Sequence, residues 1–167
     1  MMNRTKKMTT ITMLVALSVL FHMVESMIPL PIPVPGFRLG LANIVGLIAL
    51  YLFDFKIMMG VNLTRVVFAS LLKGTLFGTG FWLSLSGIIL SSLACLLAKK
   101  FTSMSIYGVS VAGSIFHAIG QVIMVTFIYQ QFFMQAILPL LIVLGIPSGL
   151  FIAFLADSVV ERLQHRL

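Results

Sequence analysis

The sequence predicts an all-α integral membrane protein with six transmembrane helices and no separate soluble domain. Of its 167 residues, 60% are hydrophobic and 9% are charged, whereas a soluble domain carries roughly 25% charged residues. Long apolar runs fill the chain and alternate with short polar turns. Because backbone groups in lipid must satisfy their own hydrogen bonds, each span is expected to be a helix. The whole chain, 1–167, is therefore expected to be one membrane domain.

Hydropathy places the six spans in order along the chain. The first is expected at 8–28, and no small-x-small cleavage site follows it, so we interpret it as an uncleaved span. The second, 41–53, is shorter than the about 20 residues that cross a full hydrocarbon core, which leaves open whether it crosses fully. The other four are expected at 57–77, 81–98, 106–129 and 136–160.

A proline-rich segment, 29–40, separates the first two spans and is called the strap here. Proline lacks a backbone N–H and fixes φ, so the alternating prolines of the strap cannot continue a helix and predict a stiff, extended segment. Two interpretations remain open, a structural turn and a gate over a substrate site. In the gate interpretation, the gating residues are Pro31, Pro33, Pro35 and Gly36.

The basic residues indicate topology and not a nucleic-acid partner. The net charge is +7, but the 11 basic residues fall mainly at segment ends and not on one face. If the N-terminus is cytoplasmic, eight of them lie inside and only Arg38 lies outside, while Arg65 and Lys73 fall within a span. The positive-inside rule then predicts six spans with both termini in the cytoplasm.

Polar residues within the spans and at the strap exit are the candidate substrate-binding residues. Ionisable groups at a helix centre cost about 2.5–3.5 kcal/mol on insertion scales, so they normally face protein or water. The candidates are Glu25, Arg38, Asn43, Arg65, Lys73, His117 and Gln121. Cations outnumber carboxylates among them, which favours an anionic ligand such as a carboxylate or a phosphate ester.

Each candidate also has a structural interpretation, which the sequence leaves open. Arg65 can form an ion pair with Glu25, and Lys73 can extend its charged end to the membrane interface. Asn43 can cap the second helix. His117 and Gln121, four residues apart on one face, can hydrogen-bond between helices. The serines and methionines of the spans are interpreted as packing residues.

Catalysis has little support in the sequence. The four acidic residues form no aspartate-rich cluster that could hold Mg²⁺ and a diphosphate, and no P-loop, GxSxG or zinc motif is present. The single cysteine, Cys95, excludes an intrachain disulfide and a CxxC metal site. We therefore expect no enzyme, no cofactor and no metal, and any uphill transport needs an external source of energy.

Three segments carry a family resemblance that covers most of the chain. They are PLPIPVPGFRLGLANIVGLIALYLF at 29–53, NLTRVVFASLLKGTLFG at 62–78 and SIYGVSVAGSIFHAIGQ at 105–121. These segments resemble the Gx transporter family, whose members are also classed as heptaprenyl diphosphate synthase component I. That family is similar to the substrate-binding S components of energy-coupling factor transporters.

The resemblance implies an S-component-like bundle in a prokaryotic plasma membrane, with a site near the outer face under the loop between helices one and two. Its implied partners are membrane lipid, a small vitamin-like or prenyl-like substrate, a coupling membrane protein and two ATPases. The first span lacks the four-residue spacing of small residues at which S components meet that coupling protein. The synthase name implies instead a non-catalytic subunit beside a prenyl synthase, or a subunit of a quinone or flavin electron-transfer system.

Overall fold

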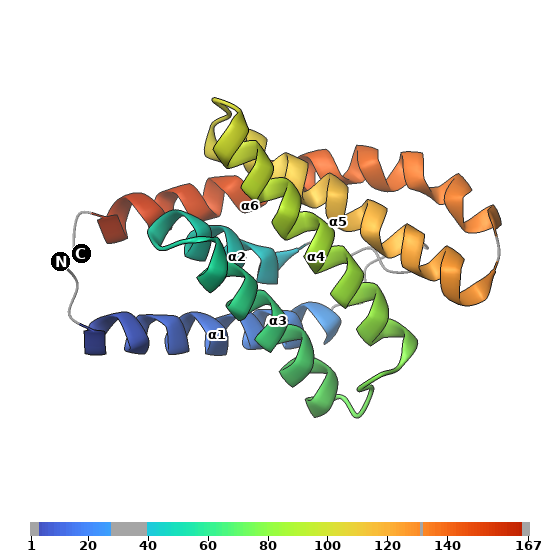
Figure 1. Ribbon diagram of the computed structural model, residues 1–167, viewed down its shortest axis with the longest axis horizontal. Coiled ribbons are helices and arrows are strands. Elements are labelled where there is room, and N and C mark those ends of the chain that lie inside the picture. The colour runs from blue at the N-terminus through green and yellow to red at the C-terminus, as the bar shows by residue number, and fades with distance from the viewer. Residues whose placement is uncertain (1–3, 28–39, 131, 165–167) are drawn as a thin grey trace.

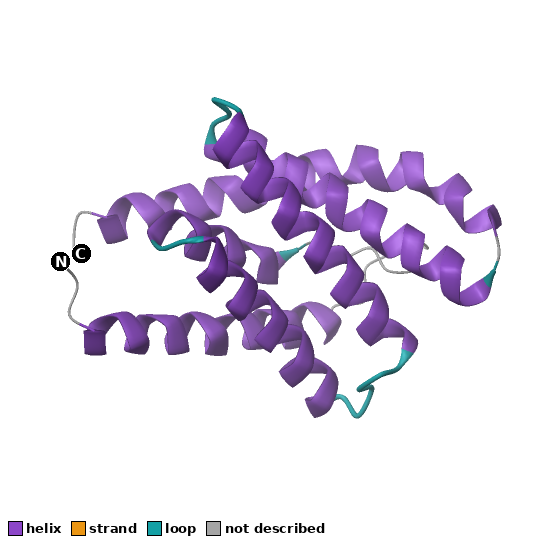
Figure 2. Ribbon diagram, viewed as in Figure 1, coloured by secondary structure: helices purple, strands orange, loops and turns teal. Residues whose placement is uncertain are grey.

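The computed structural model describes residues 4–27, 40–130 and 132–164, and these residues contain helices and no strand. The elements are α1 (Arg4–Met27), α2 (Leu41–Leu52), α3 (Phe55–Leu72), α4 (Thr79–Phe101), α5 (Ile106–Tyr129), the 3₁₀ helix η1 (Phe132–Ile137) and α6 (Leu138–Gln164). Figure 1 shows their arrangement, and Figure 2 shows how short the described connections are. The predicted all-α class is confirmed.

Five of the described helices, α1, α3, α4, α5 and α6, are long and apolar enough to cross a membrane. The sixth, α2, has 12 residues and is about 18 Å long, which is less than the roughly 30 Å of a hydrocarbon core. The start of α1 and the end of α6 lie at the same end of the bundle, called the terminal end here (Figure 1). That arrangement fits termini on one side of a membrane, and a cytoplasmic location stays a prediction.

The short helix α2 lies at the centre of the bundle. Residues 44–50 are all buried, and the helix packs against α1, α3 and α6. A helix that is apolar all round belongs in the interior. The long helix α1 contrasts with it, because Met13 and Leu20 on α1 are 67% and 60% exposed. The membrane-facing surface is thus formed by the long helices, and α2 is shielded by them.

The observed helix bounds correct two of the predicted ones. The third span was predicted to reach residue 77, but α3 ends at Leu72 and Lys73 is its C-cap. Gly74 follows with φ of 65°, the left-handed conformation common after a helix. Lys73 therefore lies at a helix end and not within a span. Helix α4 extends beyond the predicted residue 98, because the lysines of its last turn remain helical up to Phe101.

The remaining spans agree with the prediction more closely. Helix α5 has the predicted bounds, Ile106–Tyr129. Helix α1 begins at Arg4, before the first apolar run. Helix α6 continues through Pro147, and the 3₁₀ helix η1 occupies the start of the predicted sixth span.

Helices α4 and α5 pack closely and then diverge. The Ser86 hydroxyl on α4 donates a hydrogen bond to the carbonyl of Gly120 on α5 at 3.0 Å. Gly87 lets the two helices approach, since a Cβ there would lie 2.8 Å from the His117 ring. Away from this contact the helices diverge toward the end of the bundle opposite the terminal end, which is called the strap end (Figure 1).

Candidate functional site

Five helices contribute side chains to one small cavity in the interior, called the polar cavity here. Its volume is about 30 Å³. The lining combines charged, imidazole, amide and hydroxyl groups with two apolar residues, and it comprises His22, Glu25, Gly40, Ala42, Asn43, Arg65, Ser84, Ile88 and His117. The helices that contribute are α1, α2, α3, α4 and α5, with Gly40 directly before α2. The cavity is therefore a point where nearly the whole bundle meets.

Arg65 is the buried cation of this cavity. Its side chain is 2% exposed, and its Nη2 atom donates a hydrogen bond to Oδ1 of Asn43 at 3.0 Å. The interpretation of Asn43 as the cap of the second helix is therefore wrong. The N-cap is Gly40, which has no side-chain capping bond. Asn43 instead connects α2 to α3 through a charge-assisted hydrogen bond, a class stronger than neutral ones.

Glu25 connects the end of α1 to the start of α2. Its carboxylate is 5% exposed and accepts a hydrogen bond from the backbone N–H of Gly40. Gly40 has φ of 81°, and a Cβ there would lie 2.9 Å from Cδ1 of Ile152. Both the conformation and the lack of space require glycine at this position. Glu25 and Arg65, which are both candidates from the sequence, line the same cavity.

Two histidines complete the polar lining. His117 on α5 was a candidate from the sequence, whereas His22 on α1 was not. His22 is 8% exposed and lies on the buried face of α1 with Ser18 and Glu25. The spacing of three residues between His22 and Glu25 is the signal that could have identified it. Ser84, interpreted from the sequence as a packing residue, also lines the cavity.

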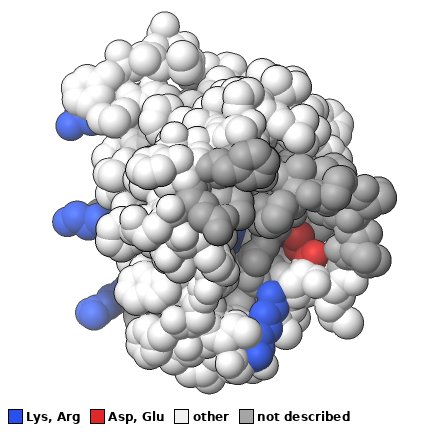
Figure 3. Space-filling view, turned by 90° about the vertical axis from the view of Figure 1, so that its right-hand side faces the viewer, with Lys and Arg blue, Asp and Glu red and all other residues white. Residues whose placement is uncertain are grey.

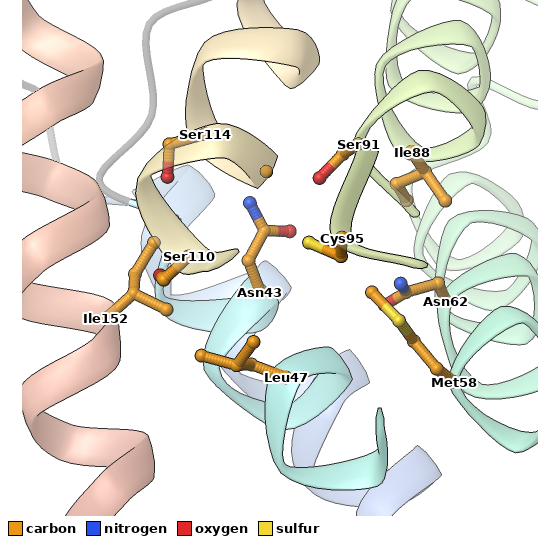
Figure 4. A pocket seen from close by; sticks show the side chains of 11 residues that line it. Asn43, Leu47, Met58, Asn62, Ile88, Ser91, Cys95, Ser110, Ser114 and Ile152 are labelled. Carbon is orange, nitrogen blue, oxygen red and sulfur yellow. The ribbon is translucent and has the colours of Figure 1, made fainter. Parts of the chain in front are cut away.

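A second small cavity, called the inner cavity here, adjoins the polar cavity. Asn43 and Ile88 line both. Figure 4 shows Asn43 between α4 and α5, with further polar groups around it. The lining is Asn43, Leu47, Met58, Asn62, Ile88, Ser91, Cys95, Ser110, Gly113, Ser114 and Ile152. Apart from Asn43, sequence reasoning missed this group, because isolated serines in spans usually serve packing.

Asn62 gives the inner cavity a specific requirement for a hydrogen-bond donor. Its Nδ2 atom donates to Oγ of Ser92 at 3.2 Å. Its Oδ1 atom is buried and has no hydrogen-bond partner among the described residues. A cavity of about 20 Å³ exceeds the roughly 10–15 Å³ that one water needs. The inner cavity thus has the size and polarity of a site for a single water molecule.

The volume of the polar cavity limits what it can hold in this conformation. About 30 Å³ accommodates one or two waters, whereas pockets for organic ligands measure roughly 300–1,000 Å³. Binding of such a ligand requires that the helices around Arg65 move apart. The hydrogen bond between Glu25 and Gly40 is one contact that holds them together.

A larger cavity, called the lateral chamber here, lies at the strap end between α4, α5, η1 and α6. Its volume is about 300 Å³, and its lining is mainly apolar: Thr79, Leu83, Gln121, Val122, Val125, Tyr129, Ile137 and Leu141. Gln121 lines this chamber and not the polar cavity, although His117 lies one turn earlier on the same helix face. The predicted pair therefore faces two different cavities.

Of the remaining candidate residues, the structure describes only Lys73. Lys73 caps α3 and does not line the cavity. Arg38 and the gating residues Pro31, Pro33, Pro35 and Gly36 lie outside the described residues, and the gate interpretation with them. Figure 3 views the strap end, where the acidic atoms of the described residues appear at one place.

The comparison with known families agrees with the sequence-based resemblance. The family model for heptaprenyl diphosphate synthase component I matches residues 14–159, which extends from α1 into α6. No curated protein and no solved structure matches the chain. The predicted family is therefore confirmed, and the similarity to S components stays a prediction.

Proposed function

This chain belongs to the heptaprenyl diphosphate synthase component I family, and we propose that it is the membrane substrate-binding protein of a transporter, similar to an S component, with its site at the polar cavity. The substrate is a small anionic molecule. The observation that carries the proposal is Arg65, which is 2% exposed in the interior of an apolar helix bundle and lines a cavity.

The energetic cost of the Arg65 position supports a role in binding. A charged side chain inside a membrane protein costs several kcal/mol unless it is paired or hydrated, and such groups mark ligand pathways by default. A guanidinium presents its donors in a planar fork that matches a carboxylate or phosphate. The imidazoles of His22 and His117 line the same cavity and can donate to the same anion.

The family description suggests the class of anion. Phosphate oxygens accept bidentate hydrogen bonds from arginine, so a prenyl diphosphate or a vitamin-like phosphate fits the chemistry of the cavity. No aspartate-rich motif accompanies the site, so under this proposal the chain binds its substrate and does not transform it. Uptake would then draw its energy from a coupling membrane protein with two ATPases.

Ligand entry requires an opening at the junction of α1 and α2. The carboxylate of Glu25 holds this junction through the N–H of Gly40, and Gly40 is the last residue of the strap. We expect that contact to break when the ligand enters. Opening of this junction would thus change the surroundings of Arg65, because Glu25 and Gly40 line the same cavity.

The proposal is tested by native mass spectrometry of the gently purified protein, with identification of the small molecules that remain bound. The wild type and the control variant Lys56→Gln, whose side chain is exposed and does not line the cavity, are expected to carry an anionic metabolite. Arg65→Gln is expected to lose it. Retention of the same metabolite by a folded Arg65→Gln protein would contradict the proposal.

A second function is favoured by the family description itself, a non-catalytic membrane subunit of heptaprenyl diphosphate synthase or of a quinone or flavin electron-transfer system. The proteins that co-purify distinguish the two. A coupling membrane protein with ATPases supports the transporter. A prenyl synthase or a redox protein, recovered without such a module, supports the accessory subunit.

A further inference from the structure

We propose that the lateral chamber holds the hydrocarbon chain of the anion whose charged group binds at Arg65. The ligand is then an amphiphile, with an anionic head in the polar cavity and a chain of roughly ten carbons in the chamber. This inference rests on the proposed function and deepens it, because it defines the second half of the same substrate. The polar cavity is called the head site here, and it does not by itself require such a chain.

The size and the lining of the chamber suit a hydrocarbon. Its volume of about 300 Å³ is twice the roughly 150 Å³ of an engineered apolar cavity that stays dry and binds benzene. Two benzene molecules contain about twelve carbons, so a chain of roughly ten carbons fits this volume. Five of its eight lining residues are aliphatic, including Val122 and Leu141, which are each 6% exposed. Burial of an alkyl chain there is favourable by roughly 25 cal/mol per Å².

The side chains that line the lateral chamber range from exposed at its rim to buried at its base. Tyr129, at its rim, is 52% exposed, and Thr79 is exposed as well. At the base, Gln121 is 8% exposed. A ligand can therefore reach the chamber from outside the bundle and extend inward along α5.

The base of the chamber adjoins the polar cavity on two helices at once. On α5, Gln121 lines the chamber, and His117, one turn away, lines the polar cavity. On α4, Leu83 lines the chamber and the next residue, Ser84, lines the polar cavity. A ligand chain that extends from the polar cavity past these residues would thus reach the chamber.

Gly87 marks the passage between the two cavities. A Cβ at this position would lie 2.8 Å from the His117 ring and 3.1 Å from Cγ of Gln121. The side chains that separate the head site from the chamber therefore meet over a residue that has no side chain. We expect rotation of His117 or Gln121 to connect the cavities beside the close backbone contact that Gly120 makes with Ser86 and Gly87.

The inference is tested with decyl phosphate that carries a diazirine at the end of its chain. The wild-type protein in lipid nanodiscs is irradiated with this probe, and the labelled residues are identified by peptide mass spectrometry. We expect labels at Val122, Val125 or Leu141. We also expect excess pyrophosphate, which competes for the head site only, to reduce the labelling of these residues. Labels confined to lipid-facing residues such as Ile123 and Phe127 would overturn the inference.

Matched variants of α5 sharpen the test. Val125→Trp places a large ring in the chamber, and Ile123→Trp places the same ring on a side chain that is 59% exposed. Binding of decyl phosphate is expected to weaken about tenfold or more in Val125→Trp and to stay unchanged in Ile123→Trp. Equal affinities in both variants would overturn the inference.

The outcomes separate this inference from the proposed function. Loss of pyrophosphate binding in Arg65→Gln, together with no chamber labelling, supports the head site and refutes the chamber as the site of the hydrocarbon chain. Chamber labelling that neither pyrophosphate nor Arg65→Gln reduces identifies an ordinary membrane lipid chain, which overturns the link to the site. Chamber labelling in a wild type that binds no pyrophosphate refutes the proposed head site and the inference built on it.

Discussion

The cations at the two ends of the bundle are used in different ways. At the terminal end, the Lys99 ammonium donates to the carbonyl of Leu50 at 2.7 Å and lies 4.4 Å from the centre of the Tyr51 ring. Toward the strap end, Arg65 is 2% exposed and bonds to the Asn43 side chain. Both cations contact α2, but Lys99 remains largely exposed and Arg65 lines a cavity.

This difference separates a stabilising cation from a candidate binding one. Carbonyl groups at a helix C-terminus have no partner in the helix, and a cation there complements them and the helix dipole. Lys99 meets that need at the end of the short α2. Arg65 serves no helix terminus, so its burial needs another compensation. The Asn43 bond supplies part of that compensation, and under the proposed function an anionic ligand adds to it.

The largest effect on stability is expected for Asn43→Leu. This variant removes the acceptor of the Arg65 hydrogen bond in the interior, and a hydrogen bond to a charged group is worth about 1.5–3 kcal/mol. Thermal unfolding in detergent should therefore show a marked loss. The control Asn43→Asp keeps an acceptor and should retain stability while weakening anion binding. An unfolding temperature unchanged by Asn43→Leu would show that Arg65 does not depend on this bond.

Gly40→Ala comes next and tests the junction between α1 and α2. The left-handed conformation at Gly40, with φ of 81°, costs about 1–2 kcal/mol for a residue with a side chain. Ile152, 2.9 Å from the position of the new Cβ, adds crowding. Gly60→Ala is the control, because a Cβ there meets nothing within 4 Å. Equal unfolding temperatures in the two variants would disprove the strain.

Lys99→Met is expected to destabilise the terminal end by about 1 kcal/mol. The variant loses a hydrogen bond to a helix end and a cation–π contact. Anion binding should not change. Lys100→Met is the comparison, since Lys100 contacts Phe101 on its own helix and should cost less. Loss of binding in Lys99→Met would mean that the two ends of the bundle are coupled.

The smallest effect on folding is expected for Gly87→Ala, which acts on the polar cavity. The new methyl group would lie 2.8 Å from Cε1 of His117, and the imidazole can rotate away. Anion affinity should fall by roughly tenfold or less, equivalent to about 1.4 kcal/mol at most. Isothermal titration with pyrophosphate measures this change. Unchanged affinity would exclude His117 from the binding site.

The sequence predicted the fold better than it predicted the helix ends. Apolar runs between polar turns determine span order, so α5 was predicted with its observed bounds. The predicted end of the third span was wrong because apolar residues continue after Lys73, while the backbone turns at Gly74. Hydropathy measures affinity for lipid, and it does not detect a left-handed residue.

The candidate site was predictable to the extent that helix faces are predictable. Charge in an apolar span identified Arg65 and Glu25. The assignment of His117 and Gln121 to different cavities depends on the packing of α4 against α5 at Gly87. Such packing is tertiary information, which no periodicity in one helix contains.

The most direct test of the account compares pyrophosphate binding to Arg65→Gln and Lys99→Gln in lipid nanodiscs. The account predicts that Arg65→Gln loses affinity by about 30-fold or more, equivalent to about 2 kcal/mol for a truncated buried charge. Lys99→Gln should bind as the wild type does. A parallel loss in both variants would show that the general positive charge attracts the anion, and it would contradict a specific site at Arg65.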